Sequence, residues 1–505
     1  MRYSLVFSLC LTLAGGARAQ LRPFGDVHAI VGARIEIGDG RVIEKGTVLI
    51  RDGLIEALGP DLAVPPDAEV LKGDGLTVFP GFVDAFLTKG LKLPDSQPNQ
   101  DVPPDTGSEA PASMRTANRK GVRPELRAAD FFVLTEADLT PIRKAGFTTA
   151  LVSPSGATIN GVAALVNLSG LPKRECIVRS AVTMDFAFHT PTEGRSFGGG
   201  SGYPGTLLGI FAHIRQTLMD ARYYRLLKTA FENGGPRRPP ADESLAALLP
   251  ALDGAMPVLF EADAENDVDR AVRLADEFGL RPILCGGLEA WKHAPLLVKH
   301  QVPVLLSLDF GDEPKLPGQK PPQETKQDAK EEKKEAKPAP GEKPPTTPAT
   351  KPEDKKEEDE DEFMPEAARK ERHRKWEEKV ANAGQLNKAG VLFAFTTKGV
   401  KDTTTFWENL RRAVKEGLPR EAALKALTLN PAKIFGVERQ MGTIEAGKIA
   451  DLVVMQGDFS DAKAKVKFVF VDGKKFDVER ESPPAPARPP GSPMEGDDRL
   501  GRGDR

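Results

Sequence analysis

Apolar and polar positions alternate in short runs over residues 27–76. The clearest runs lie at 29–37, 46–50 and 54–58. Between the last two, Asp52-Gly53 is a favoured hairpin turn. Alternation of this kind is typical of half-buried β-strands, so the pattern predicts a small β domain here.

Strand-like and helical segments alternate from residue 78 onward. In the clearest stretch, a strand-like run at 258–260 leads into a segment with one apolar helical face, formed by Val268, Ala271, Val272 and Ala275. Gly279 stands where that helix would stop. The pattern then predicts a strand at 283–285, a helix at 289–299 and a strand at 302–308. Because the unit recurs at 138–152 and 391–414, we expect a parallel sheet with helical crossovers, and its spread favours a (β/α) barrel.

Two segments lack the apolar residues that a folded core needs. Residues 317–362 contain no Val, Ile, Leu, Met, Phe, Trp, Tyr or Cys, so they cannot offset the entropy of ordering. We predict a disordered charged insertion in a barrel loop, with an electrostatic docking tether as the alternative. The Pro-rich tail, residues 481–505, is also predicted to be disordered.

The first nineteen residues have the features of a signal peptide. Arg2 precedes an apolar run over 3–14, and Ala17-Arg18-Ala19 supplies small residues for cleavage before Gln20. The apolar run is shorter than the roughly 20 residues that span a bilayer, which argues against a retained anchor. We therefore expect an exported protein, periplasmic or secreted, with no membrane span after cleavage.

Composition and charge narrow the range of partners. The chain has 505 residues, of which 40% are hydrophobic, and its 70 basic and 73 acidic residues give a net charge of −3. A large core is expected, and nothing in this balance indicates nucleic-acid binding. After cleavage only Cys176 and Cys285 remain, too few for a disulfide framework. A homo-oligomer remains possible.

Two motifs at opposite ends of the chain point to a family. The run VFPGFVD at 78–84 resembles the strand that opens the catalytic barrel in amidohydrolases of the imidazolonepropionase and dihydroorotase type. The runs LNPAKIFG at 429–436 and GTIEAGKIADLVV at 442–454 resemble the carboxy-terminal return of the same family. The resemblance implies a (β/α)8 TIM-like barrel beside a small β-sandwich built from the amino- and carboxy-terminal segments.

The resemblance also sets domain boundaries. It divides the chain into a signal peptide (1–19), a first sandwich part (20–78), a barrel (79–436, with the insertion at 317–362), a second sandwich part (437–480) and the tail (481–505).

The family's metal ligands are replaced in this chain. Such enzymes hold zinc or another divalent ion with histidines and an aspartate, and the metal activates a water molecule. Phe86 and Thr88 occupy the positions of the His-x-His motif, Glu261 and Gly286 those of the fifth- and sixth-strand histidines, and Lys398 that of the eighth-strand aspartate. Since an ammonium repels a metal ion, we expect no metal and no other cofactor.

The histidine pattern supports the same expectation. None of the six histidines is two or four residues from another. His28 and His373 are expected at the surface, and His213, His293 and His300 lie in or beside predicted helices. His189, after a strand-like run, is the best remaining candidate, although a lone histidine there is more often structural.

Charged residues at expected strand ends are the remaining candidates for chemistry. Asp84, Glu261 and Lys398 are the catalytic candidates, and the ammonium of Lys398 could replace the positive charge of the metal beside Glu261. The alternatives are a stabilising ion pair in a relict site and a catalytic carboxylate with a shifted pKa. A ligand pocket is expected to be lined by Phe86, Thr88, Asp185, His189, Asp263, Gly286 and Asp309. The Gly-containing loop 153–156 is also expected at this rim.

Three functions remain open. The leading interpretation is a catalytically degenerate amidohydrolase-fold protein, a pseudoenzyme that binds a small molecule or a protein partner at the old active-site mouth. The second is a hydrolase of non-peptide C–N bonds, such as those of cyclic amides, with an unconventional or metal-free site. The third is an interaction scaffold that uses the charged insertion.

Overall fold

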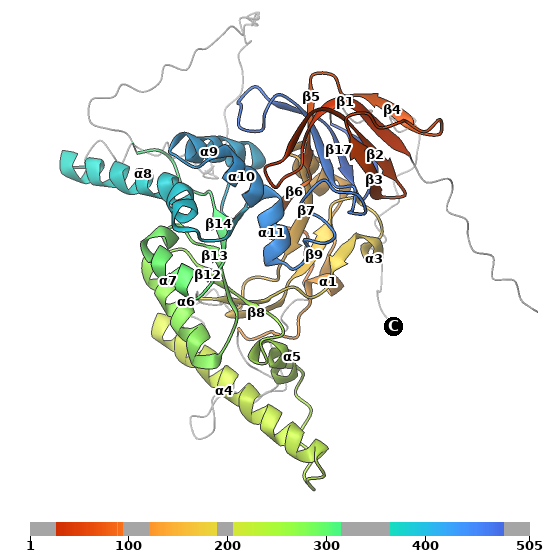
Figure 1. Ribbon diagram of the computed structural model, residues 1–505. Coiled ribbons are helices and arrows are strands. Elements are labelled where there is room, and N and C mark those ends of the chain that lie inside the picture. Colours follow the sequence, from red (N-terminus) through yellow and green to blue (C-terminus); the bar gives the residue numbers. More distant parts are fainter. Residues whose placement is uncertain (1–26, 88, 94–120, 189–205, 315–363, 479–505) are drawn as a thin grey trace, which may run out of the picture.

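The computed structural model describes residues 27–87, 89–93, 121–188, 206–314 and 364–478 (Figure 1). The predicted signal peptide, charged insertion and tail lie outside the described residues, as do Thr88 and His189. No helix in these five ranges is long and apolar enough to cross a membrane.

Strands from both ends of the chain form one eight-stranded sheet in the order β18-β17-β16-β5-β1-β2-β3, with β4 beside β1. Its strands are β1 (His28–Glu36), β2 (Val42–Arg51), β3 (Leu54–Gly59), β4 (Glu69–Lys72), β5 (Leu76–Pro80), β16 (Leu452–Gln456), β17 (Lys465–Val471) and β18 (Lys474–Asp477). The two ends meet where β5 and β16 pair antiparallel. The terminal segments thus share one sheet, as the resemblance implies, while the two-layered sandwich remains a prediction.

The VFPGFVD run changes sheets in its middle. Its first residues end β5, and its last begin β6 (Phe82–Leu87), the first strand of the barrel-like part. Gly81 lies at the change, where a Cβ atom would stand 2.2 Å from the Thr148 side chain. Since a Cβ contact that short is a clash, the close approach of β6 to its neighbour requires glycine.

The remaining strands form two mixed sheets in place of the continuous parallel barrel that the sequence predicted. One has the order β10-β9-β7-β6 and the other β15-β14-β13-β12-β11-β8. Their strands are β7 (Phe147–Val152), β8 (Ile159–Val162), β9 (Ala164–Asn167), β10 (Ile177–Arg179), β11 (Met184–Ala187), β12 (Val258–Ala262), β13 (Pro282–Gly286), β14 (Val304–Ser307) and β15 (Phe393–Thr396). Neighbours from β11 to β15 are parallel, as are β6 and β7.

The two mixed sheets connect at both ends, which gives a TIM-barrel-like α/β fold. At one end the chain passes from β8 in one sheet to β9 in the other, and both strands pair antiparallel with their neighbours. At the other end Thr396 Oγ1 donates a hydrogen bond to the carbonyl oxygen of Phe86, 2.8 Å away. Within the described ranges the backbone ladder is interrupted at both places, so no closed barrel is formed there.

Helices flank the strands of the barrel-like part, and α6 (Glu265–Phe278) packs on β12 and β13 (Figure 1). The longer ones are α2 (Glu136–Lys144), α4 (Leu207–Glu232), α5 (Glu243–Leu252), α6 (Glu265–Phe278), α8 (Glu366–Ala389), α9 (Thr403–Lys415) and α10 (Arg420–Leu427). The shorter ones are α1 (Ala128–Phe131), α3 (Lys173–Cys176), α7 (Ala294–Lys299), α11 (Leu429–Ile434) and the 3₁₀ helix η2 (Ala290–His293).

The helix predicted from residue 268 is confirmed as α6, and Gly279 ends it in the left-handed conformation, with φ 66°. The helix predicted at 289–299 is divided into η2 and α7, with Pro295 in the first turn of α7.

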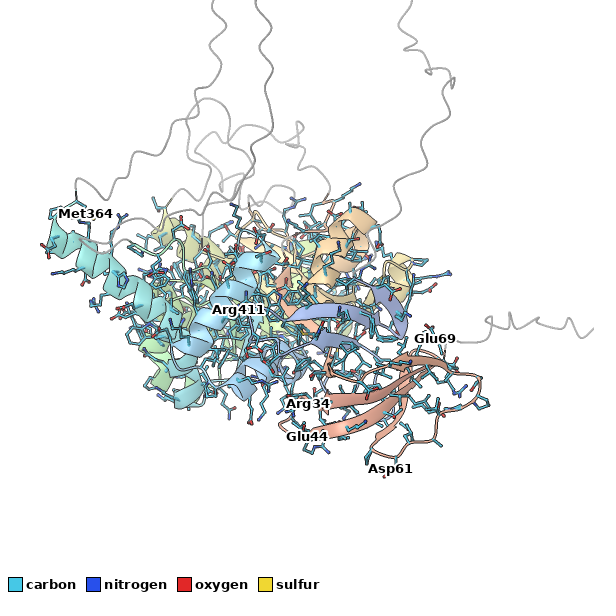
Figure 2. All side chains as sticks on the ribbon, turned by 90° about the horizontal axis from the view of Figure 1, so that it is seen from above. Arg34, Glu44, Asp61, Glu69, Met364 and Arg411 are labelled. Carbon is cyan, nitrogen blue, oxygen red and sulfur yellow. The ribbon has the colours of Figure 1, made fainter. Side chains whose placement is uncertain are left out.

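The terminal sheet lies beside the barrel-like part. Figure 2 shows the labelled Arg34 and Glu44 on this sheet, well away from Met364 at the start of α8. The guanidinium of Arg420, on α10, reaches across to two carboxylates, Glu36 of β1 and Asp458 after β16. This ion-pair network fixes the two parts against each other.

Candidate functional site

A group of charged side chains gathers at the carboxyl ends of the parallel strands. Glu261 lies on β12, Asp185 on β11, and Lys398 two residues after β15. Carboxyl ends of parallel strands lie at one edge of a sheet, which is where barrel enzymes carry their active sites.

Lys398 and Glu261 form an ion pair, the contact that the sequence predicted. The ammonium of Lys398 donates to Glu261, and the two side chains are 19% and 11% exposed. Lys398 Nζ also lies 5.4 Å from the centre of the Phe86 ring, within reach of a cation–π interaction. Burial would lower the pKa of Lys398, but the neighbouring Cys285 and Glu261 outweigh it and raise the pKa. The lysine therefore stays charged at neutral pH.

Asp185 is a buried acid beneath this pair. Ser153 Oγ donates to its Oδ2 at 2.7 Å, whereas its Oδ1 has no hydrogen-bond partner among the described residues. Burial, reinforced by the negative charge of Glu261, raises the pKa of Asp185 well above its ordinary value. The buried carboxyl therefore favours its protonated form more than an exposed aspartate does.

Asp84 joins two strands. The backbone N–H groups of Phe86 and Thr397 donate to its Oδ1 at 3.2 and 3.0 Å, and the Thr397 hydroxyl donates to its Oδ2. Burial raises the pKa of Asp84 to about 6 in spite of these hydrogen bonds. Both carboxylate oxygens accept hydrogen bonds that hold β6 to the segment carrying Lys398. Asp84, a catalytic candidate from the sequence, therefore positions this segment.

Gly286 and Asp263 share one small space. A Cβ atom on Gly286 would lie 2.0 Å from Asp263 Oδ1, and Gly286 has a φ of 101°. The Asp263 carboxyl therefore fills the place of the side chain that a sixth-strand histidine would extend. Burial raises the pKa of Asp263, while the charge of Lys398 opposes that shift.

Asp309 follows β14 and packs on the turn after Lys398. A Cβ atom on Gly399 would stand 2.9 Å from Asp309 Oδ2, and the Gly311 N–H donates to Asp309 Oδ1 at 3.3 Å. Asp309 thus belongs to the same strand-end group.

Sequence reasoning did not single out three members of the site. Asn160 Nδ2 approaches Glu261 Oε1 at 3.5 Å, Ser153 binds Asp185, and Cys285 is buried on β13 with its thiol pKa raised by desolvation. Loop 153–156 was predicted at the rim, but no motif distinguished Ser153. Asn160 lies on β8, which is antiparallel to β11, whereas the sequence predicted parallel strands alone.

The residues present do not fit the metal centre of the family. Phe86 offers a ring and Lys398 an ammonium where that centre needs an imidazole and a carboxylate. In the described part of the chain, no three His, Cys, Asp or Glu residues are grouped to hold a metal ion. We derive no reaction step through a metal, and the metal-free site stays a prediction.

The described histidines lie elsewhere. His213 is in α4, and His293 and His300 flank α7. The surface prediction for His28 was wrong, because this residue is buried in β1, with Nδ1 3.1 Å from Glu69 and its ring against Phe470. The sequence did not indicate this burial, because a polar residue in an alternating run is expected to face solvent.

Comparison with known proteins gives both sequence and structural matches. The model of the Amidohydrolase family matches residues 360–476. A segment of 69 residues is 42% identical to the dihydroorotase of Mycobacterium tuberculosis, covering 14% of this chain and 15% of that protein. A segment of 74 residues is 38% identical to the adenine deaminase of Archaeoglobus fulgidus, covering 15% of this chain and 12% of that one. The matches thus span a small part of these relatives.

The structural match is much longer. The crystal structure of an amidohydrolase from Thermotoga maritima MSB8 superposes with a TM-score of 0.66 and 24% identity, over 89% of this chain and 99% of that one. At 24% identity, this match shows a likeness of fold, the TIM-barrel-like α/β arrangement described above. The sequence likeness to the Amidohydrolase family covers residues 360–476, and the structural likeness extends over the fold.

Proposed function

We propose that this protein binds a small molecule or a protein partner at the mouth of the barrel-like part through a metal-free site centred on Lys398 and Glu261. The observation that carries the proposal is the ion pair itself, with Lys398 beside the Phe86 ring. A fixed ammonium occupies the region where a relative would need a divalent cation. The site keeps a positive charge without a metal-bound water.

The electrostatics support ligand binding. Lys398 has three N–H donors and, among the described residues, donates one hydrogen bond to Glu261, while the side chain remains 19% exposed. A carboxylate or carbonyl oxygen at the mouth can accept from the ammonium. Meanwhile Glu261 and Asp263 can accept from a ligand amine, so we expect a ligand that carries both kinds of group.

Metal content tests the absence of a metal centre. Protein purified from metal-replete medium is expected to contain no stoichiometric metal and to show no saturable binding when titrated with Zn²⁺ or Mn²⁺. One equivalent of either ion bound at micromolar or tighter affinity would contradict the proposal.

Ligand binding is tested by thermal unfolding with a panel of amino acids and small carboxylates. A compound that raises the melting temperature of the native protein is expected to lose its effect on Lys398→Met. Lys370→Met, in the exposed ion pair with Glu366 on α8, is the control and should leave the effect intact. A shift that survives Lys398→Met would place the ligand elsewhere.

The second candidate is hydrolysis of a non-peptide C–N bond. The family match favours it, and Asp185, whose pKa is raised by burial, is the candidate to protonate the leaving nitrogen, as amide hydrolysis requires. Dihydroorotate and adenine, suggested by the names of the matched relatives, are the first substrates to test. If the metal-free protein turns over one of these substrates and Asp185→Asn abolishes that turnover, the protein is a hydrolase and not a binding protein alone.

A further inference from the structure

Helix α4 is apolar on two opposite faces. One face packs on the barrel-like part through buried residues that include Ile210, Ile214, Leu218 and Ala221. The opposite side of the helix carries an outer stripe of residues whose spacing alternates between four and three. These residues are Ala212, Gln216, Met219, Tyr223, Leu226 and Ala230. All six are exposed, with Met219, Tyr223 and Leu226 at 51%, 62% and 65%.

This spacing is the heptad repeat of a helix that pairs with another helix. At 3.6 residues per turn, the centre of the stripe lies nearly half a turn from the centre of the buried row, so the two faces are opposite. A helix needs one apolar face to pack on its own domain. The outer stripe therefore has no role in the packing of the described chain.

The second half of α4 is held to the molecule through partly buried side chains: Arg222 lies over the Phe278 ring, and Arg225 pairs with Asp253. No residue from 222 to 232 is buried, and Figure 1 shows α4 running out past α5. A partner along the exposed stripe would bury the apolar surface that these contacts leave open.

The edges of the stripe carry opposite charges. Arg215 and Arg222 follow one edge, and Asp220 lies on the other. Arg215 is held at its edge by Glu277 of α6, 2.7 Å away, and Asp220 accepts from Gln216 at 2.8 Å. An anionic lipid surface would favour basic residues on both edges. Opposite edges instead fit a parallel copy of the same helix, in which Arg215 faces Asp220 of the second copy.

We propose that the outer stripe of α4 is a homodimer interface, in which a second copy of this chain pairs its own α4 in parallel about a two-fold axis. The two barrel-like bodies lie on opposite sides of the helix pair, because each packs on the face of α4 that points away from the stripe. Such an isologous contact is closed, and it places Met219, Tyr223 and Leu226 against their own counterparts.

Sedimentation of the purified full chain over a concentration series tests the proposal. We expect a reversible dimer whose dissociation constant rises at least about tenfold in Leu226→Glu, since a charge replaces a central apolar contact. Val298→Glu, at a helical site on α7 that is 44% exposed, is the matched control and should leave dimerisation unchanged. Melting curves of both variants verify folding. A monomer at every concentration, or a dimer insensitive to Leu226→Glu, overturns the proposal.

Cross-linking tests the parallel register. Leu226→Cys is expected to form a disulfide with its counterpart under mild oxidation, whereas Lys228→Cys, on the opposite side of the helix, is not. Arg215→Glu should weaken the dimer, and adding Asp220→Arg should restore it. Failure of both tests overturns the pairing. So does a monomer that binds phosphatidylglycerol vesicles in a flotation assay and loses this binding in Leu226→Glu.

Discussion

Lys398 and Glu261, 137 residues apart in sequence, form an ion pair across the carboxyl edge of the six-stranded sheet. Thr396 Oγ1 accepts from the backbone N–H of Lys398 at 3.0 Å while donating to the Phe86 carbonyl. The lysine is thus held by β15 and β6 while its ammonium reaches β12.

Removing one partner of this ion pair should destabilise the protein more than removing both. In Glu261→Gln the ammonium of Lys398 stays nearly buried without its partner, and we expect a loss of about 3 kcal/mol in the free energy of unfolding. The double variant Lys398→Met/Glu261→Gln should recover most of it. Urea unfolding measures these values.

The control for that cycle is the exposed pair of Lys370 and Glu366, whose separate substitutions should each cost below about 1 kcal/mol. Additive losses at Lys398 and Glu261 would show that the two residues do not interact.

The raised pKa of Asp84 should make stability fall between about pH 4 and pH 6. Its pKa is raised from 3.8 to about 6, so in this window the folded protein binds more protons than the unfolded chain. The stabilisation is complete below the unfolded pKa and is lost as the pH rises through the folded value. Urea unfolding at a series of pH values should show a decline on the order of 1–3 kcal/mol from this residue.

Asp84→Asn should remove that part of the pH dependence. Asp451, also buried, has its pKa raised to about 7, and its contribution, of the same sign, should persist in Asp84→Asn up to about that pH. A pH profile identical in native protein and Asp84→Asn would contradict the assignment.

Gly286→Ala should be far more destabilising than Gly279→Ala. Both glycines have positive φ, 101° and 66°, but a Cβ atom at 279 meets nothing within 4 Å while one at 286 meets Asp263. We expect a cost of about 1 kcal/mol at 279 and at least about 3 kcal/mol at 286, measured by thermal unfolding. In the background of Asp263→Ala the two costs should become similar. An equal cost in the native background would place Asp263 away from Gly286.

Arg420→Met should loosen the terminal sheet from the barrel-like part. The guanidinium is half-buried and pairs with Glu36 and Asp458, so its removal leaves Asp458 without this cation and Glu36 with Arg34 as its remaining partner. We expect a loss of about 2–4 kcal/mol in the free energy of unfolding. Hydrogen exchange should rise in β1 and β5 before it rises in β12. Uniform exchange across all three strands would argue against a local role.

Part of the site was predictable from sequence because its residues stand at strand ends. The runs before Glu261 and Lys398 are apolar and strand-like, so parallel strands place both side chains at one edge. Ser153 and Asn160 could not be ranked in this way, because neither is charged or matches a motif, and Asn160 lies on the antiparallel strand β8. Asp84 was correctly placed at the first barrel strand, but only its contacts with Thr397 and Phe86 show that it positions other groups.

The sequence by itself determined the alternation of strands and helices, the stop of α6 at Gly279, and the presence of a phenylalanine ring at position 86. These features depend on local periodicity, backbone conformation and side-chain chemistry. Tertiary structure alone decided that the strands form two mixed sheets, that Asp263 fills the space beside Gly286, and that Asp185 is buried beneath Lys398 and Glu261. Burial and pKa depend on neighbours brought together by folding, and no local pattern encodes those neighbours.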